Sequence, residues 1–133
     1  MDRYTLNTKK EGFYNITEAV STAVRRSGID DGIAVVFCPH TTAGITINEN
    51  ADPDVVQDML TGLERAYPDR PEYRHAEGNS AAHLKASAVG SSVAVIIQNG
   101  RLALGTWQGI YFTEFDGPRT RNYYVKITGE QQK

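Results

Sequence analysis

Residues 93 to 104 read Val93-Ala94-Val95-Ile96-Ile97-Gln98-Asn99-Gly100-Arg101-Leu102-Ala103-Leu104. Two short runs rich in apolar residues flank Asn99-Gly100, a pair that favours a tight hairpin turn because both of its residues tolerate positive φ. The sequence therefore predicts a β-hairpin with strands at Val93–Gln98 and Arg101–Leu104.

Strand patterns continue towards the C-terminus. Gly109–Phe115 is rich in Ile, Tyr and Phe, which favour strands. Asp116-Gly117-Pro118 is typical of a turn. Residues 123–128 then alternate between apolar and polar side chains, which predicts a last strand with one exposed face.

The first half of the chain mixes helix and strand signals. Asn15-Ile16-Thr17-Glu18 resembles a capping box, and Asp52-Pro53 combines an acceptor cap with proline in the first turn. We expect helices over Thr17–Ser27, from Asp52-Pro53 to near Ala66 and over His83–Val89, a long loop over Tyr67–Ala81, and strands at Tyr4–Thr8, Ile33–Phe37 and Gly44–Asn48.

The order of these elements predicts the fold class. Helices lie early and strands gather late, which indicates an α+β fold whose antiparallel sheet is covered by helices on one face. The all-apolar Ile33–Phe37 predicts a strand buried on both faces. A length of 133 residues fits a single domain over residues 1–133.

Composition narrows the class of protein. Hydrophobic residues make up 40% and charged residues 23%, as in soluble globular proteins. A net charge of −2 without clustered Lys and Arg argues against non-specific nucleic-acid binding. Without a run of about 18 apolar residues or a signal sequence, we expect no membrane span and a cytoplasmic location. The single cysteine, Cys38, cannot form an internal disulfide and fits a reducing compartment.

The three histidines are the first candidates for chemistry. His40 ends a predicted strand, His75 lies in the long loop and His83 begins a predicted helix. Imidazole is the commonest ligand for zinc and similar metals, and three such ligands leave a position open for substrate. The spacing of the histidines also fits three unrelated residues, because no His-x-His or His-x-x-x-His pair is present.

Other polar residues have both a structural and a functional interpretation. Asp52 and Asp54 are explained by helix capping, whereas Glu49 precedes the cap and is a candidate metal ligand or general base. The hydroxyls of Thr41 and Thr42 fit either phosphate binding or an ordinary turn. Trp107 is either a core anchor or a residue that stacks on a ligand, and Gln108 beside it offers a polar side chain. Arg119 is either a phosphate ligand or a turn residue paired with Glu114 or Asp116. Cys38 is either a soft metal ligand or an inert core residue.

Four segments together resemble the YjbQ-like family, also called the secondary thiamine-phosphate synthase family. They are His40-Thr41-Thr42-Ala43-Gly44-Ile45, Asn48-Glu49-Asn50-Ala51-Asp52-Pro53, His75-Ala76-Glu77-Gly78-Asn79-Ser80-Ala81-Ala82-His83-Leu84-Lys85, and Leu104-Gly105-Thr106-Trp107-Gln108-Gly109-Ile110 with Glu114-Phe115-Asp116-Gly117-Pro118-Arg119. The matched segments occur in order over nearly the whole chain.

The resemblance implies a fold, an assembly and an activity. The implied fold is an antiparallel meander sheet bent into an open half-barrel and covered by two to three helices, and the implied assembly is a homotrimer. The implied activity is that of a thiamine-phosphate synthase, which couples a pyrimidine pyrophosphate to a thiazole phosphate and releases pyrophosphate. That activity looks secondary. A non-catalytic trimer that binds a metal or a phosphorylated metabolite is the alternative.

The resemblance also assigns roles to matching residues. The expected cofactor is a divalent metal, zinc or similar, with magnesium as a partner of pyrophosphate. The expected metal ligands are His40, His75 and His83. The expected catalytic residues are His83, Glu49 and Glu77. The expected ligands of a small phosphorylated metabolite are Thr41, Thr42, Asn79, Lys85, Trp107, Gln108 and Arg119.

Overall fold

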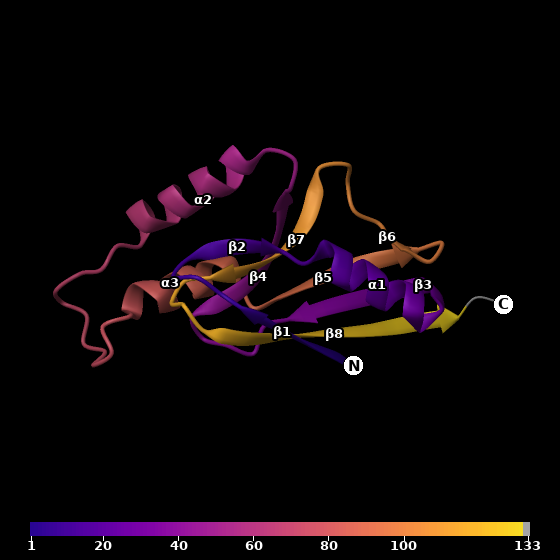
Figure 1. The fold of residues 1–133 in the computed structure, drawn as a ribbon, viewed down its shortest axis with the longest axis horizontal. Coiled ribbons are helices and arrows are strands. Elements are labelled where there is room, and N and C mark those ends of the chain that lie inside the picture. Colours follow the sequence, from indigo (N-terminus) through magenta and orange to yellow (C-terminus); the bar gives the residue numbers. More distant parts are fainter. Residues whose placement is uncertain (132–133) are drawn as a thin grey trace.

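The structure of the chain is a computed structural model that describes residues 1–131. These residues form three helices and two sheets, arranged as Figure 1 shows. In chain order the elements are β1 (Asp2–Asn7), β2 (Gly12–Asn15), α1 (Thr17–Ser27), β3 (Ile29–Phe37), β4 (Ala43–Glu49), α2 (Pro53–Ala66), α3 (Ser80–Val89), β5 (Ser92–Gln98), β6 (Arg101–Leu102), β7 (Gln108–Glu114) and β8 (Thr120–Gln131).

The two sheets are antiparallel throughout. The larger sheet has the strand order β1-β8-β3-β5-β6 and curls into a half-barrel, and the smaller sheet has the order β2-β7-β4. Helix α1 packs on the inner face of the larger sheet, where the buried Val20 and Val24 join a core that includes Val36, Ile97 and Val125. The predicted α+β half-barrel is confirmed.

Short sequence patterns predicted the positions of two elements accurately. The hairpin between β5 and β6 turns at Asn99 and Gly100, whose φ angles are 53° and 73°. Helix α1 has the predicted bounds, and the side chain of Asn15 accepts a hydrogen bond from the amide of Thr17 at 3.0 Å. The residue at the cap position is Ile16, one residue later than the predicted cap.

Three predictions need correction. Strand β2 was not predicted, because its four residues carry only a short apolar pattern. Helix α3 begins at Ser80 inside the predicted loop, because the small residues that precede His83 are compatible with a helix. Strand β3 was expected to be buried on both faces, yet only its inner face is covered in this chain, while Ile33, Val35 and Phe37 are 46%, 39% and 42% exposed.

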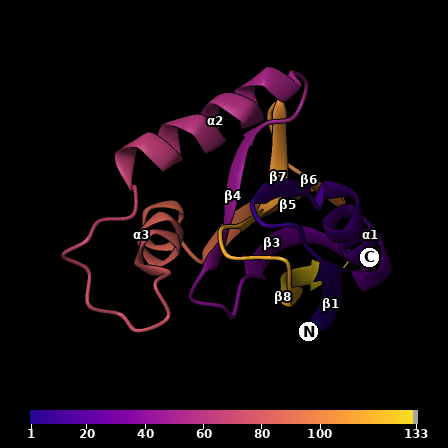
Figure 2. The same cartoon turned by 60° about the vertical axis from the view of Figure 1, so that its left-hand side comes forward.

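Helix α2 stands away from the sheets, as Figures 1 and 2 show from two directions. It begins as predicted, with the Asp52 carboxylate accepting a hydrogen bond from the amide of Asp54 at 2.9 Å. None of its residues is buried. Its apolar stripe is only half-covered and consists of Val55, Val56, Met59, Leu60 and Leu63. Within residues 1–131, no helix is both long and apolar enough to cross a bilayer.

Candidate functional site

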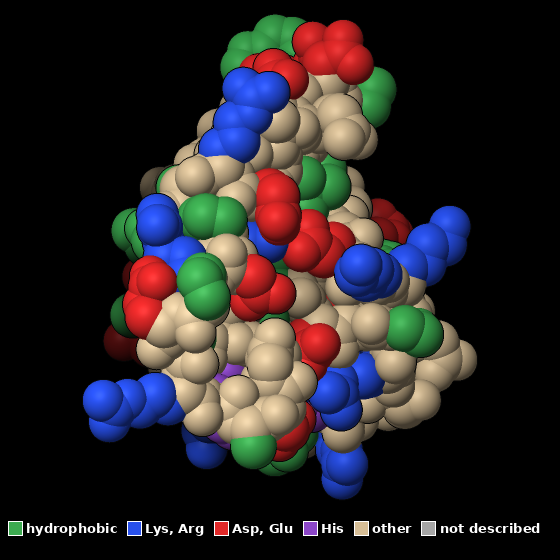
Figure 3. All heavy atoms as spheres, turned by 90° about the vertical axis from the view of Figure 1, so that its left-hand side faces the viewer, with side chains coloured by type: hydrophobic (Ala, Val, Ile, Leu, Met, Phe, Trp, Pro, Cys, Tyr) green, Lys and Arg blue, Asp and Glu red, His purple; other side chains and the backbone are tan. Residues whose placement is uncertain are grey.

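All three histidines line one hollow of about 410 Å³, which we call the histidine pocket. Its walls come from the loop after β3, the loop between α2 and α3, the start of α3 and the start of β8. Figure 3 shows this side of the molecule, with histidine side chains partly visible among carboxylates and cationic groups. The lining residues are Pro39, His40, Thr41, Thr42, His75, Glu77, Asn79, His83, Arg119 and Arg121.

His40 is fixed by the backbone of β8. The amide of Asn122 donates a hydrogen bond of 3.0 Å to Nε2 of His40. Burial, together with the charge of Arg121, lowers the pKa of His40 below its usual value. The imidazole is therefore neutral at pH 7, with one ring nitrogen already engaged.

A buried ion pair lies beneath the pocket. Arg121 donates from Nε and Nη2 to the two carboxylate oxygens of Glu114, at 2.7 and 2.5 Å, and from Nη2 to Oγ1 of Thr42 at 2.8 Å. Glu114 has no exposed side-chain surface, and it also accepts a hydrogen bond from Thr8 at 2.6 Å. Although burial alone raises the pKa of Glu114, the hydrogen bonds from Arg121 and Thr8 lower it overall, so the carboxylate stays charged.

Asp116 connects two further wall residues. Its side chain accepts hydrogen bonds from Asn79 at 2.8 Å and from Arg119 at 3.0 Å, and its carbonyl accepts another from Nε of Arg119 at 2.8 Å. Burial raises the pKa of Asp116, but these two partners lower it overall. Arg119 is therefore a turn residue paired with Asp116, as one interpretation of the sequence allowed, and it also faces the pocket. Oδ1 of Asn79 is buried without a hydrogen-bond partner among residues 1–131.

The other two histidines form the far wall. The rings of His75 and His83 lie 5.3 Å apart, edge to face, and Nε2 of His75 is 3.9 Å from Oε1 of Glu77.

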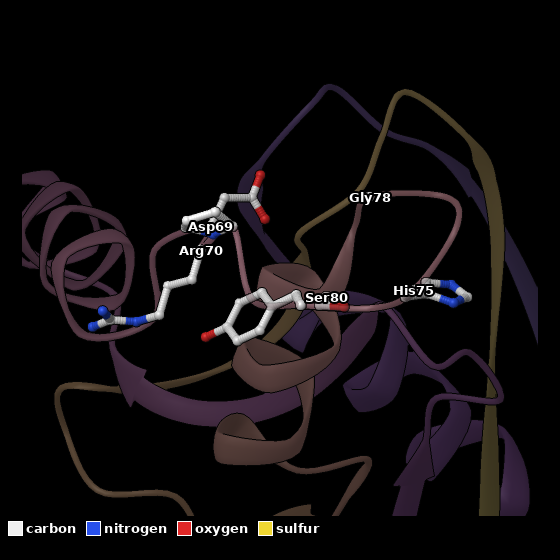
Figure 4. A pocket seen from close by; sticks show the side chains of 7 residues that line it. Asp69, Arg70, His75, Gly78 and Ser80 are labelled. Atoms are coloured by element: carbon white, nitrogen blue, oxygen red, sulfur yellow. The ribbon is translucent and has the colours of Figure 1, made fainter.

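Two neighbouring hollows adjoin this wall. One, of about 450 Å³, shares His40, Thr41 and His83 with the histidine pocket and continues along the small residues of α3. The other, of about 350 Å³, lies in the loop beside His75, where Figure 4 shows His75 pointing away from Arg70.

Lys85 does not reach the histidine pocket. Its side chain is 3% exposed, and its ammonium contacts Glu11 at 2.9 Å and also Glu64. Burial lowers the pKa of Lys85, but the hydrogen bonds to Glu64 and Glu11 raise it overall. In this structure Lys85 links α3, α2 and the loop before β2, and it lies outside the lining of the histidine pocket that was expected to bind phosphate.

Three expected site residues lie at the opposite end of the smaller sheet. Glu49 and Gln108 are paired across β4 and β7, whereas the histidine pocket adjoins the other end of that pair, where Ala43 faces Glu114. At about 3.3 Å per residue, β4 separates the two ends by roughly 20 Å. Trp107 is 62% exposed beside Gln108, whose side chain accepts a hydrogen bond from the amide of Gly105. One chain does not bring these residues to its own histidines.

The predicted three-histidine metal centre is not assembled in this chain. Nε2 of His40 already accepts the Asn122 amide. No group of three His, Cys, Asp or Glu side chains within residues 1–131 is placed to hold a metal ion together. His75 and His83 keep both ring nitrogens free of hydrogen bonds within that range, but they are two ligands and not three. Cys38 is buried, and burial raises its pKa, so it is not a ready thiolate ligand.

Sequence reasoning missed Arg121 as a pocket residue and missed its buried pairing with Glu114, which lies beneath the pocket. A signal was present, because the alternation through Tyr123 and Val125 places residue 121 on the inner face of the same strand. A charged residue at an inward position needs a buried partner. The residue that faces inward at the end of β7, Glu114, supplies that partner.

A family model described as UPF0047 protein YjbQ-like matches residues 2–130. The UPF0047 protein YugU of Bacillus subtilis is 58% identical over 123 residues, which cover 92% of this chain and 93% of that protein. The UPF0047 protein MJ1081 of Methanocaldococcus jannaschii is 52% identical over 130 residues, covering 97% and 94%. A crystal structure of a yjbq/upf0047 family protein from Clostridium acetobutylicum matches with a TM-score of 0.94 at 60% identity, covering 96% of this chain and 100% of that one.

Proposed function

The chain belongs to the UPF0047 YjbQ-like family, and we propose that its histidine pocket binds the phosphate or pyrophosphate group of a small metabolite. The observation that carries the proposal is the convergence of Arg119, Arg121 and three histidines on one hollow of about 410 Å³. Guanidinium groups recognise phosphate oxygens through several donors at once. The hydroxyl of Thr41, on the same wall, adds a neutral donor.

Each arginine of the pocket is paired with a carboxylate, so its positive charge is partly balanced before a ligand binds. Arg121 is balanced by Glu114, and Arg119 is balanced by Asp116. Nη1 of both arginines makes no hydrogen bond within residues 1–131, so each guanidinium keeps donors for a ligand. Carboxylates that hold these arginines also fix where the donors lie, and donors fixed in advance lose less conformational entropy on binding.

We propose further that the protein is an enzyme of the thiamine-phosphate synthase type. In that reaction the pyrimidine pyrophosphate is the electrophile, the thiazole phosphate is the nucleophile, and pyrophosphate leaves. Negative charge grows on the leaving pyrophosphate, so the arginines and the imidazole of His83 would stabilise it. Glu77, 3.9 Å from His75, would orient that histidine or accept a proton.

A divalent metal remains a prediction. His75 and His83 are the residues of the pocket with ring nitrogens left for it, and a bound zinc or magnesium ion would supply further positive charge to the pyrophosphate. Because a three-histidine ligand set does not fit the contacts of His40, no step of the proposed reaction depends on the metal.

Calorimetric titration with pyrophosphate tests the binding proposal. Arg119→Ala should weaken binding by roughly 10- to 150-fold, because a charged hydrogen bond contributes about 1.5–3 kcal/mol. Arg26→Ala is the matched control, because Arg26 is an exposed arginine of α1 outside this pocket. Equal affinity of the parent and Arg119→Ala for pyrophosphate would remove Arg119 from the site.

A turnover assay with the purified protein separates the enzyme from its non-catalytic rival. With the pyrimidine pyrophosphate and the thiazole phosphate as substrates, the parent should release pyrophosphate, and His83→Ala should abolish the release. The assay is run with and without added zinc or magnesium. Tight pyrophosphate binding without release under either condition would favour a binding protein.

We also propose that copies of the chain assemble into a trimer. Each copy has two apolar faces that its own residues leave wholly or partly uncovered. One is the outer face of the larger sheet, with Ile33, Val35, Phe37 and Ile96, and the other is the half-covered apolar stripe of α2. The outer face of the curled sheet and the projecting helix are unlike surfaces, so the proposed contact pairs one with the other. Contacts between unlike surfaces build closed rings when the rotation closes.

Charged residues lie near both faces, and those on the sheet are of both signs, because the exposed Asp31 and Glu130 pair on its outer face. On the polar side of α2, Asp54 and Asp58 are exposed. The outer face of the larger sheet carries the exposed cations Arg3 and Lys126, because Arg3 pairs with Tyr124 and Val35 pairs with Lys126 on that face. In such a ring, α2 of one copy would cover the exposed sheet of the next.

A further inference from the structure

The contact of His40 with β8 has a simple origin in the sheet. The last residue of β3 paired with β8 is Phe37, opposite Tyr124. Asn122 lies two residues earlier on β8, beyond the end of that pairing. Its amide therefore finds no strand partner on that side, and it donates instead to Nε2 of His40 at 3.0 Å. The imidazole extends the hydrogen-bond ladder by one bond.

The contact determines which ring nitrogen carries the proton. A backbone amide can only donate, so Nε2 must present a lone pair. A neutral imidazole carries one N–H, which is then on Nδ1. We infer that His40 is held as the Nδ1–H tautomer and serves the histidine pocket as a fixed hydrogen-bond donor to an oxyanion of the ligand.

The surroundings of Nδ1 agree with a role towards a ligand. Nδ1 of His40 makes no hydrogen bond within residues 1–131, and the ring lines both the histidine pocket and the adjoining hollow of about 450 Å³. A free N–H on this ring suits a non-bridging, negatively charged oxygen of a phosphate group, because such an oxygen is the stronger hydrogen-bond acceptor.

The same contact opposes metal binding by His40. Coordination through Nε2 would remove the hydrogen bond from Asn122. Coordination through Nδ1 would require the proton to move to Nε2, where it would face the amide proton of Asn122. Both routes lose a hydrogen bond in the sheet, so His40 differs in role from His75 and His83, which have no such restraint within residues 1–131.

Nuclear magnetic resonance of histidine-labelled protein tests the tautomer directly. Long-range ¹H–¹⁵N spectra distinguish a protonated from an unprotonated ring nitrogen, with assignment by comparison with His40→Asn. We expect Nδ1 of His40 to be protonated and Nε2 to be unprotonated at pH 7, and we expect both signals to persist when one equivalent of Zn²⁺ is added. An Nε2–H tautomer, or a zinc-induced loss of the His40 signals, would overturn the inference.

Titration with pyrophosphate tests the donor role, which rests on the proposed function. His40→Asn places an amide N–H close to the position of Nδ1, whereas His40→Leu removes the donor. His40→Leu should bind pyrophosphate about tenfold more weakly than the parent, and His40→Asn should stay within about threefold, as expected for one hydrogen bond. Equal binding by all three would overturn the donor role.

The two failures can be told apart. If the parent binds no pyrophosphate, the proposed ligand class fails together with the donor role towards it, while the tautomer is still decided by the resonance experiment. Thermal unfolding of both variants checks that they fold. If His40→Leu does not fold, the comparison of His40→Asn with the parent still tests the donor role, because a more than tenfold loss in His40→Asn would contradict a donor at the Nδ1 position.

Discussion

Glu114 is a charged residue with no exposed side-chain surface, and Arg121, Thr8 and the backbone amide of Asp116 supply its hydrogen bonds. An isolated buried carboxylate would be strongly destabilising, so its partners keep it in place. Because Arg121 also holds Thr42, the ion pair connects the interior of the protein to the wall of the histidine pocket. The ion pair thus positions Thr42 in the wall of the histidine pocket.

Replacing Glu114 tests this role. Glu114→Gln leaves the guanidinium of Arg121 buried without its counter-charge, and breaking a buried pair in this way costs about 3–5 kcal/mol. The free energy of unfolding, measured in urea, should fall by that amount. Glu130→Gln removes the same charge from an exposed position of β8 and should change it by less than about 0.5 kcal/mol. A similar small loss in both variants would contradict the role.

The pKa of Glu114 and that of Asp116 predict how stability depends on pH. Both are lowered overall in the folded state, despite burial, by hydrogen bonds from Arg121 and Thr8 to Glu114 and from Asn79 and Arg119 to Asp116. Their contribution is therefore present above the unfolded values of 4.5 and 3.8, and it is lost as the pH falls below these through the folded values. Urea unfolding from pH 6 to pH 2 should show this loss, and Glu114→Gln should show less of it.

At the scale of elements, the sequence predicted best where the signal is local. The Asn99-Gly100 turn and the Asp52-Pro53 helix start each depend on adjacent residues, and both are confirmed. Strand β2 depends on its pairing with β7, far away in the chain. Glu114 is close to Arg121 in the chain, but the two residues lie on different strands, so no short pattern within one strand specifies their pairing. The sequence also could not show that the expected site residues are separated. Only the β4–β7 register shows that Glu49 and Gln108 lie away from His40.

Helix α2 contacts the body of the protein near its C-terminal end, where Leu63 packs against Ala82, Ala86 and Phe115 and a buried cation pairs with Glu64. Lys85 of α3 joins Glu64 of α2 to Glu11. Lys85→Met should free the C-terminal half of α2 and the loop that follows, and their amides should exchange with deuterium faster than in the parent. Arg65→Met, which removes an exposed cation of α2, is the matched control. Unchanged exchange in Lys85→Met would show that other contacts hold the helix.

At the scale of the whole molecule, the prediction that β3 is buried on both faces differs from what the single chain shows. Its sequence is apolar on both faces, as in strands covered on both sides, but this chain covers only the inner face. The exposed Ile33, Val35 and Phe37 continue into Ile96 of β5, because Ile33 pairs with Ile96. A contiguous apolar patch of this kind marks an interface more often than a free surface.

The proposed trimer can be tested at the centre of that patch. Ile96 is 64% exposed in the single chain, so Ile96→Asp should leave the fold of one copy intact while placing a charge in the interface. Light scattering at micromolar concentration should then give a trimer for the parent and a monomer for Ile96→Asp. Thr61→Asp adds the same charge to the exposed polar side of α2 and should remain a trimer. A monomeric parent would contradict the assembly, and a trimeric Ile96→Asp would contradict the surface assigned to it. The fold is checked independently by circular dichroism, because a variant that loses its strands would lose the interface for a different reason.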